Sequence, residues 1–381
     1  MYKYLYRKCL DKDVIRAAWH KLRKGKTKRR DVKYIDANLE DCINRVRDMI
    51  WNTRPCDVPE PKKAFNPPKH ESKEIIEHGK KRKIYCPNIW EQWVHHIVIQ
   101  VLAPIVTKRA YKFSCGSMPK RGSHFGKREM ERVVKRKFRN FLKCDIRHFF
   151  DSVRLSVAVK MLEKEIEDEW FIYLIKVIFK HFKKGLPLGY YPSQWISNYI
   201  LCELDDAIMK EEPNGYVRYM DDMVVADNNK KKLRKILIIV KKELGKLRLR
   251  LKRNYQISKF LYVKKTGKVI GRCVDFMGFV FKPYATVLRK KIMIRACRCA
   301  SKISKKEKIS LKQAQSMLSR CGYFKHTDTY GTWLSHIKTK INVKQLKMVV
   351  SWNMKRRNRH EKRMEIRKMQ QRARAVQTAI A

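Results

Sequence analysis

The sequence predicts a mixed α+β chain in which a small antiparallel sheet is accompanied by many helices. Two short β-prone runs, Tyr216–Met220 and Met223–Ala226, flank an Asp-Asp pair and are typical of a hairpin. A third apolar run, Phe141–Ile146, is typical of a neighbouring strand. From Ile196 to Ile208 apolar residues recur every fourth position, which predicts an amphipathic helix. Separate groups of helices and short strands favour an α+β fold.

The N-terminal part is expected to be mostly helical. Residues 1–50 have the pattern of basic amphipathic helices, joined by the charged linker RKGKTKRRD at Arg23–Asp31. Prolines recur from Pro55 to Pro68 and exclude a regular helix there, because proline lacks the N–H group that a helix needs.

A β-rich element is expected around Lys80–Cys86, followed by a helix at Ile89–Val106, where apolar residues recur at helical spacing. His95 and His96 fall within that helix. Histidines on an apolar helix more often pack or contact phosphate than bind metal, so neither is assigned as a ligand.

Helices and strands alternate through the middle of the chain. Residues 155–183 look helical, Gly185–Gly189 is a turn, and a helix begins near Ser193. Lys230–Gly245 is expected to be helical. In Leu247–Lys252 leucines alternate with basic residues, which predicts a strand with one buried face.

The C-terminal part is basic. Val274–Phe281 predicts another β segment, and from about Tyr284 the chain is expected to be mostly helical. Lys355–Arg374 is the most basic stretch, and we expect it to be disordered or to become helical on nucleic acid.

Charge is the unusual feature of the composition. The 381 residues include 91 Lys and Arg but 36 Asp and Glu, a formal net charge of +55. A chain this basic repels itself unless a polyanion offsets the charge, and phosphate backbones are the usual polyanion. The composition indicates a nucleic-acid partner, and it fits a ribosomal or chromatin-like binder as well as an enzyme.

The cysteines and the apolar runs bear on the compartment. Eleven cysteines are scattered singly without any C-x-x-C pair, which argues against disulfides and a zinc module and for reduced thiols. The N-terminal residues lack an apolar signal core, and the longest apolar run, Phe171–Phe179, is interrupted by Lys176. We therefore expect a cytoplasmic protein that does not contact a membrane.

Three carboxylates form the candidate site. Asp221 and Asp222 stand at the tip of the predicted hairpin, and Asp145 ends the neighbouring strand. An Asp-Asp pair alone is usually a solvated turn, but adjacent acids beside apolar strands are costly without cations. Two divalent metals held by such acids can activate a 3′-hydroxyl and neutralise a triphosphate.

Seven segments stand out in order along the chain: GKKRKIYCP (Gly79–Pro87), SCGSMPKRGSHFGK (Ser114–Lys127), LKCDIRHFFDS (Leu142–Ser152), GLPLGYYPSQWISN (Gly185–Asn198), YVRYMDDMVV (Tyr216–Val225), LRLRLKRN (Leu247–Asn254) and VDFMGFVF (Val274–Phe281). In this order they resemble the motifs of reverse transcriptases of the bacterial retroelement type. The resemblance covers about Gly79 to Phe281.

The resemblance implies a right-hand polymerase with fingers, a palm containing an antiparallel sheet, and a helical thumb. Residues 1–140 would be an N-terminal extension and fingers, 141–283 the palm with a helical insertion at 155–183, and 284–381 the thumb and basic tail. The implied activity is RNA-directed DNA synthesis from deoxynucleoside triphosphates. An RNA template and a cDNA primer or product would be the partners, with a basic accessory protein or self-association as further candidates.

Family roles at the chemical centre map onto five residues. By resemblance, Asp145, Asp221 and Asp222, with Ile146 beside them, would hold two Mg²⁺ ions, or Mn²⁺ in their place. Lys252 matches a lysine proposed to protonate the leaving pyrophosphate. Ordinary binding to a phosphate backbone is the alternative for Lys252.

Further roles concern the substrates. The resemblance implies that the triphosphate and sugar of the incoming nucleotide would contact Lys80, Arg82, Phe150 and Gln194. Phe150 would lie under the sugar, and a generic basic surface is the alternative for Lys80 and Arg82. The template and primer would contact Arg121, Gly189, Ser193, Met277 and Gly278, the last two forming a tight turn at the primer end.

The segment before the predicted helix suggests a subtype. An aliphatic Leu188 precedes Gly189, and Gln194 follows Ser193, as in enzymes of diversity-generating retroelements, within a clade that resembles group II intron enzymes. Antiphage-defence reverse transcriptases share similar variants and stay open as an alternative. A nucleic-acid-binding scaffold that keeps the polymerase fold is the second class of function.

Overall fold

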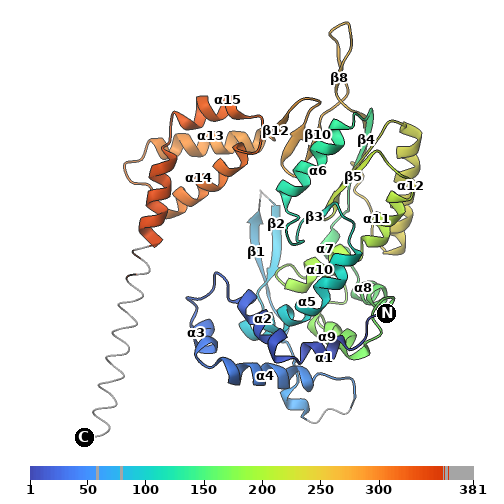
Figure 1. Ribbon diagram of the computed structural model, residues 1–381, viewed down its shortest axis with the longest axis vertical. Helices are drawn as coiled ribbons and strands as arrows, with labels where there is room; N and C mark the ends of the chain where they lie inside the picture. The colour runs from blue at the N-terminus through green and yellow to red at the C-terminus, as the bar shows by residue number, and fades with distance from the viewer. Residues whose placement is uncertain (57–59, 78–79, 355, 357–358, 360–381) are drawn as a thin grey trace. The chain divides into compact units, whose positions relative to one another are not determined.

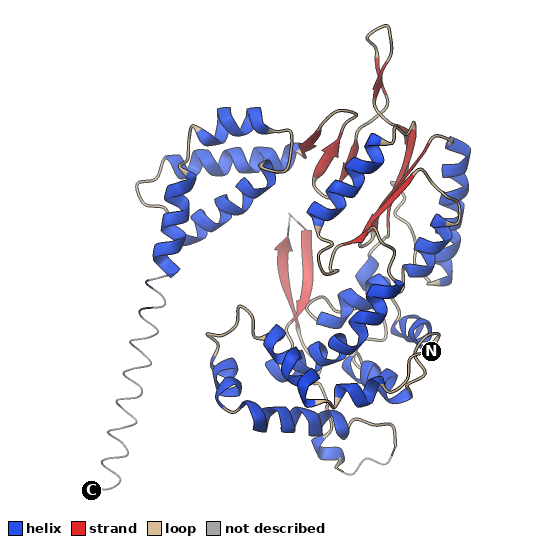
Figure 2. Cartoon of the chain, viewed as in Figure 1, coloured by secondary structure: helices blue, strands red, loops and turns tan. Residues whose placement is uncertain are grey.

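The computed structural model describes residues 1–56, 60–77, 80–354, 356 and 359 (Figure 1). The described chain divides into two compact units. The first comprises Met1–Phe260 with Ile270–Arg272, and the second Leu261–Val269 with the residues from Cys273 onward. Both units combine helices and strands, which confirms the predicted α+β class (Figure 2).

The first unit begins with helices, as predicted. They are α1 (Leu5–Cys9), α2 (Lys12–Leu22), α3 (Arg30–Ala37), α4 (Leu39–Trp51) and α5 (Ile89–Arg109), with a 3-10 turn η1 at Pro61–Lys63. α5 is apolar on nearly every side, which is the pattern of a helix buried in a core. α2 and α10 (Tyr191–Tyr199) pack against it. The Trp93 indole donates to the Ile15 carbonyl over 2.9 Å, which ties α5 to α2.

A two-stranded ribbon precedes α5. It pairs β1 (Ser72–Glu77) with β2 (Lys80–Tyr85). β2 was predicted and β1 was not. The Tyr85 N–H donates to the Leu188 carbonyl over 2.8 Å, so the ribbon ends against the turn that leads into α10.

A five-stranded sheet is the centre of the first unit. Its order is β3-β5-β6-β4-β7, and every pairing is antiparallel except that of β3 with β5. The strands are β3 (Ser114–Cys115), β4 (Asn140–Asp145), β5 (Gly215–Tyr219), β6 (Asp222–Asp227) and β7 (Gln256–Lys259). The predicted strand ending on Asp145 and the predicted hairpin are confirmed, and they lie side by side.

Helices surround the sheet. They are α6 (Ser123–Lys135), α7 (Phe149–Ser152), α8 (Leu155–Glu163), α9 (Glu169–Ile178), α11 (Cys202–Met209) and α12 (Lys230–Lys246). α6 packs on β5, whereas α12 packs on β4 and β6. The Asn229 side chain caps α12 by accepting hydrogen bonds from the N–H groups of Lys231 and Lys232. These are donors that the first turn of a helix leaves without a partner.

The strand predicted at Leu247–Lys252 is wrong. Arg248 has a φ of +56°, which a strand cannot contain. The segment is a turn after α12, and a single bridge joins Leu251 to Ile146. The strand beside β4 is β7, eight residues after Arg248.

The second unit carries a small sheet and helices. Strands β10 (Val274–Phe276), β11 (Phe279–Phe281) and β12 (Thr286–Leu288) form an antiparallel sheet. The short ribbon of β8 (Tyr262–Val263) and β9 (Val269–Ile270) falls at the division of the units. The helices are α13 (Lys290–Ser304), α14 (Leu311–Phe324), α15 (Tyr330–Trp333) and the π-helical turn η2 (Leu334–Lys338).

The expected division into residues 1–140, 141–283 and 284–381 stays a prediction. β11 pairs with β12 across position 283/284. The division between the two compact units lies between Phe260 and Cys273. The basic stretch Lys355–Arg374 lies almost entirely outside the described residues.

All eleven cysteines are free, as predicted. Within the described part of the chain, no helix combines the length and the apolar character that crossing a membrane requires.

Candidate active site

The sheet register brings the predicted aspartates to one edge. Asp145 at the end of β4 lies directly opposite Asp222 at the start of β6. Asp221 sits in the turn between β5 and β6, and its carbonyl accepts from the Ile146 N–H over 3.2 Å. The chain positions these residues because β4 and β6 pair along their whole length, so their ends meet.

The Asp145 carboxylate affects the ionisation of Asp221. Burial raises the pKa of Asp221 to about 6, and the Asp145 carboxylate beside it acts in the same direction, while Lys252 opposes the rise. Asp145 Oδ1 is buried and has no hydrogen-bond partner among the described residues. Two acids in one poorly solvated place therefore favour a shared proton or a cation.

Lys252 contacts the same centre. Its N–H donates to the Asp145 carbonyl over 2.9 Å, and its ammonium group pairs with Asp145 Oδ2. Both side chains are about one third exposed, so solvent reaches the pair. The turn after α12 thus places Lys252 on the carboxylate that ends β4.

A divalent cation fits the donor chemistry of this edge, although the full ligand group is not assembled. Carboxylate oxygens are the ligands that Mg²⁺ prefers, and Asp145 Oδ1 is a buried acceptor in need of a partner. Yet no three His, Cys, Asp or Glu side chains of the described residues gather into a group that could hold a metal ion. Ionised carboxylates repel one another unless a cation lies between them, and the Lys252 ammonium takes one oxygen of Asp145.

The residues expected to contact the nucleotide lie on three elements of the first unit. Arg82 is exposed on β2 and Gln194 is exposed on α10, whereas Phe150 is half-buried in α7 with its ring edge-on to Phe149. Lys80 begins β2, and its side chain lies outside the described residues.

The residues expected to touch the template make contacts with the main chain of the first unit. Ser193 is fully buried inside α10, not at its cap, and its hydroxyl donates to the Pro187 carbonyl over 2.7 Å. The Arg121 guanidinium donates to the Tyr111 carbonyl over 3.1 Å. Gly189 has a φ of +103°, and a Cβ there would lie 2.0 Å from the Tyr85 carbonyl oxygen, which only glycine permits.

Met277 and Gly278 belong to the second unit. Both have positive φ, of +53° and +87°, and they join β10 to β11 in the two-residue turn that hairpins favour. The tight turn predicted there is confirmed. The aspartates belong to the first unit, so the position of this turn relative to them stays a prediction.

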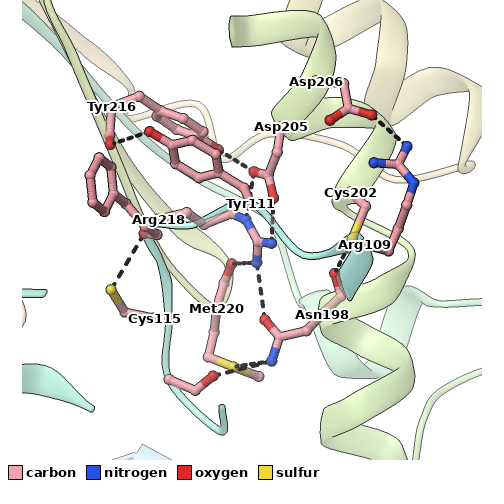
Figure 3. A network of polar contacts seen from close by, with 12 residues as sticks. Arg109, Tyr111, Cys115, Asn198, Cys202, Asp205, Asp206, Tyr216, Arg218 and Met220 are labelled. Carbon is pink, nitrogen blue, oxygen red and sulfur yellow. Dashed lines mark hydrogen bonds and ion pairs between the residues drawn. The ribbon is translucent and has the colours of Figure 1, made fainter. Parts of the chain in front are cut away.

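Sequence reasoning missed a buried polar network behind the aspartates. Arg218 on β5 is fully buried and pairs with the equally buried Asp205 of α11, while its remaining nitrogen contacts Asn198 and Met220 (Figure 3). The available signal was an arginine within an otherwise apolar strand, YVRY.

The chain was compared with known families and solved structures. A family model described as "Reverse transcriptase (RNA-dependent DNA polymerase)" matches residues 62–279. No curated protein matches the chain. Solved structures that match include apo telomerase from Candida tropicalis, with 14% identity and a TM-score of 0.46, covering 66% of this chain and 52% of that one. A form truncated from its C-terminal domain matches with 13% identity and a TM-score of 0.45, covering 58% and 55%. The chain thus spans about half the length of these structures, and likenesses at this level carry no argument about its chemistry.

Proposed function

Because the chain belongs to the reverse transcriptase (RNA-dependent DNA polymerase) family, we propose that it synthesises DNA on an RNA template at the edge of the β4–β6 pair. The substrates would be deoxynucleoside triphosphates and the 3′ end of a primer. The observation that carries the proposal is the register that sets Asp145 opposite Asp222 with Asp221 in the adjoining turn.

Asp145, Asp221 and Asp222, with Ile146 beside them, would hold two divalent cations, Mg²⁺ or Mn²⁺. When bound, such ions lower the pKa of a 3′-hydroxyl and neutralise charge on the triphosphate. The raised pKa of Asp221 supports this assignment, since a cation replaces the proton that the two crowded acids favour.

Other residues would orient the substrates. Lys252 lies beside Asp145, where its ammonium group can donate a proton to the departing pyrophosphate. Lys80 and Arg82 on β2 would bind the triphosphate, and Arg82 offers the forked donors that suit phosphate. Phe150 would lie under the sugar, and Gln194 would contact the nucleotide.

Template and primer contacts are assigned by the same reasoning. Arg121, Gly189 and Ser193 would position the template through the backbone that they hold in place, as the Ser193 hydroxyl holds Pro187. The turn of Met277 and Gly278 would support the primer end.

Primer extension on a defined RNA tests the proposal. Asp221→Ala and Asp145→Ala should each abolish nucleotide addition while leaving RNA affinity largely intact, because affinity comes from many Lys and Arg side chains elsewhere. Asp206→Ala, which removes an acid from α11, is the matched control and should extend normally. A wild-type chain that binds RNA but never extends a primer would instead indicate a nucleic-acid-binding scaffold.

Within the family, we propose a diversity-generating retroelement enzyme that copies its template with errors. Leu188 is half-buried in the turn before α10 and offers no side-chain hydrogen bond, where many relatives place an amide. A pocket that relies on packing discriminates less than one that hydrogen-bonds its ligand. Gln194, exposed on α10, is the second feature of this subtype.

Sequencing cDNA made by the purified chain tests the subtype. Frequent errors at template adenines, reduced by Leu188→Gln, are expected. An ordinary error rate without an excess at adenine would remove this subtype and leave antiphage defence, or another retroelement role, as the function.

A further inference from the structure

Met220, the residue before Asp221, has a backbone conformation that needs support. Its φ is +55°, in the left-handed region, which a non-glycine residue adopts at a cost of about 1–2 kcal/mol. The turn that it begins joins β5 to β6, contains Asp221 and leads directly into Asp222, the first residue of β6. A change in the Met220 backbone therefore displaces both carboxylates.

Three separate segments hold Met220 in this conformation. Its N–H donates to the Cys115 carbonyl over 3.0 Å, and its carbonyl accepts from Arg218 Nη1 over 3.0 Å. Its sulfur lies 3.5 Å from the amide nitrogen of Asn198. Gly116 packs against the side chain so closely that a Cβ there would lie 2.9 Å from Met220 Cγ. Figure 3 shows the side chains of Arg218 and Asn198 pointing towards Met220.

Arg218 is itself fixed by a buried acid. Arg218 Nε and Nη2 donate to the two oxygens of Asp205 over 2.8 and 2.6 Å, a bidentate pair in which both side chains are fully buried. The Tyr216 hydroxyl donates to the same carboxylate over 2.6 Å. The bidentate pair with Asp205 thus fixes the orientation of the guanidinium group, and Nη1 points towards the Met220 carbonyl.

Asn198 extends the network to α10. Its side-chain oxygen Oδ1 accepts from Arg218 Nη1 over 3.1 Å, and its side-chain nitrogen Nδ2 donates to the main-chain carbonyls of Gly116 and Gln194 over 3.1 and 3.2 Å. The Asn198 side chain therefore joins the helix that carries Gln194 to Arg218, which in turn holds the Met220 carbonyl.

Stability does not account for a buried pair of this kind. Removing two charges from water costs several kcal/mol per ion, and replacing such a pair by apolar residues of similar volume is often neutral or stabilising. A buried network that is fully satisfied does, however, specify one geometry.

We propose that Arg218, Asp205 and Asn198 are positioning residues that hold the Met220 turn and thereby set Asp221 and Asp222 against Asp145. All three side chains are fully buried, so none is placed to contact a substrate. The inference rests on the proposed polymerase function, and its direct consequence concerns the affinity of the edge for divalent cations.

An apolar replacement of the network tests the proposal. In the triple variant Arg218→Met, Asp205→Leu and Tyr216→Phe, no buried charge or hydroxyl loses its partner, so we expect the chain to fold. The complex of the triple variant with template and primer should bind Mn²⁺ less tightly than the wild-type complex does. The Mg²⁺ concentration for half-maximal extension should rise. The rate of nucleotide addition should fall on the order of 10- to 100-fold, as for a small misplacement of catalytic groups. RNA affinity should be unchanged.

A neighbouring ion pair provides the matched control. Arg109 pairs with Asp206, the residue after Asp205 on α11, but both side chains are partly exposed and neither contacts Met220. The variant Arg109→Gln with Asp206→Asn should keep wild-type Mn²⁺ affinity and Mg²⁺ dependence.

Each outcome either supports or overturns the positioning role of the network. Wild-type Mn²⁺ affinity and Mg²⁺ dependence in a folded triple variant would overturn the proposal and reduce the network to packing. Should the triple variant not fold, Asn198→Ala, which leaves the Arg218–Asp205 pair in place, takes over the test with the same expected weakening of Mn²⁺ binding. If the wild-type complex binds Mn²⁺ but extends no primer, the polymerase function fails while the Mn²⁺ comparison still tests the network.

Discussion

Lys252 and Asp145 are joined twice, once through the backbone and once through their side chains. The Lys252 N–H donates to the Asp145 carbonyl over 2.9 Å, and the ammonium group pairs with the Asp145 carboxylate. The backbone bond places the lysine on the candidate metal ligand whatever its side chain does. A cation that binds the buried Oδ1 of Asp145 lies close to that ammonium group and is repelled by it.

Lys252→Met should therefore separate cation binding from catalysis. Removing one positive charge from the edge should tighten Mn²⁺ binding, on the order of tenfold for about 1.4 kcal/mol of lost repulsion. Nucleotide addition should nonetheless slow, because the proton donor is gone. Lys241→Met is the control, since Lys241 lies over the Tyr255 ring. Unchanged addition in Lys252→Met would assign Lys252 to backbone binding.

Asp221→Asn should stabilise the metal-free chain at neutral pH. The folded-state pKa of Asp221 is raised from 3.8 to about 6, so the folded chain holds that proton more tightly than the unfolded chain. The contribution of Asp221 to stability is therefore largest below pH 4, falls as the pH rises to about 6, and stays lower above it. Without the acid the loss disappears, a gain of about 3 kcal/mol at pH 8 and little at pH 4.

Thermal unfolding with and without Mg²⁺ measures this effect. Mg²⁺ should raise the melting temperature of the wild-type chain at pH 8 and leave that of Asp221→Asn unchanged. A variant less stable than the wild-type chain in EDTA would contradict the repulsion between Asp221 and Asp145.

The strands and turns of the site were predictable from the sequence, whereas their support was not. β4, β5 and β6 are apolar runs between polar turns, so periodicity identified them. β1 was missed because its sequence, SKEIIE, is largely exposed on a two-stranded ribbon and carries no alternation. The strand expected at Leu247–Lys252 failed because a leucine at every second position also suits a turn that buries Leu247 and Leu249.

The buried network around Arg218 could not be predicted from local sequence patterns. Arg218 and Asp205 are thirteen residues apart, and a charge in each looks like a solvated face until the fold closes over both. The positive φ of Met220 is likewise a property of the tertiary structure, since methionine does not favour it. Pairing of distant side chains leaves no local periodicity from which it could be predicted.

Phe150→Ala should weaken the preference for deoxynucleotides. Phe150 is half-buried, and its carbonyl accepts from the Leu186 N–H over 2.7 Å, so the backbone beneath the ring is fixed by the turn before α10. A ring held in that way under the sugar would leave no space for a 2′-hydroxyl. The ratio of kcat/KM for a deoxynucleotide over its ribonucleotide should fall in the variant. An unchanged ratio would mean that another residue selects the sugar.

His95→Phe should make the chain more resistant to acid. Burial lowers the pKa of His95 to about 3, and both ring nitrogens lack hydrogen-bond partners among the described residues. The unfolded chain takes up the proton below about pH 6.5 and the folded chain does not, so stability falls as the pH drops from 6.5 towards 3. At pH 5 this loss is about 2 kcal/mol.

Phenylalanine keeps the ring that packs 4.8 Å from the ring of Tyr190 and removes the titration. Urea unfolding at pH 7 and pH 5 gives the comparison. The variant should lose less stability between the two pH values than the wild-type chain. Equal losses would place the acid sensitivity in His96, whose pKa burial lowers to about 4, or in other groups.

Gly189→Ala should disrupt the junction between the β1–β2 ribbon and α10. A Cβ at Gly189 would lie 2.0 Å from the Tyr85 carbonyl oxygen, and φ there is +103°, so both the contact and the backbone conformation exclude a side chain. The collision involves main chain on both sides, and relief requires the end of β2 to move away from the turn. That movement breaks the bond from the Tyr85 N–H to the Leu188 carbonyl. The expected cost is on the order of 3 kcal/mol, together with weaker use of nucleotides, because β2 carries Arg82.

Gly245→Ala is the control. Gly245 lies within α12, and a Cβ added there would meet no atom within 4 Å. Alanine should therefore stabilise that helix by up to about 1 kcal/mol. Differential scanning calorimetry of the two variants compares the same chemical change at a packed and an open site. If Gly189→Ala melted with the wild-type chain, the close approach of Tyr85 to this turn would be wrong, and with it the link between the ribbon and α10.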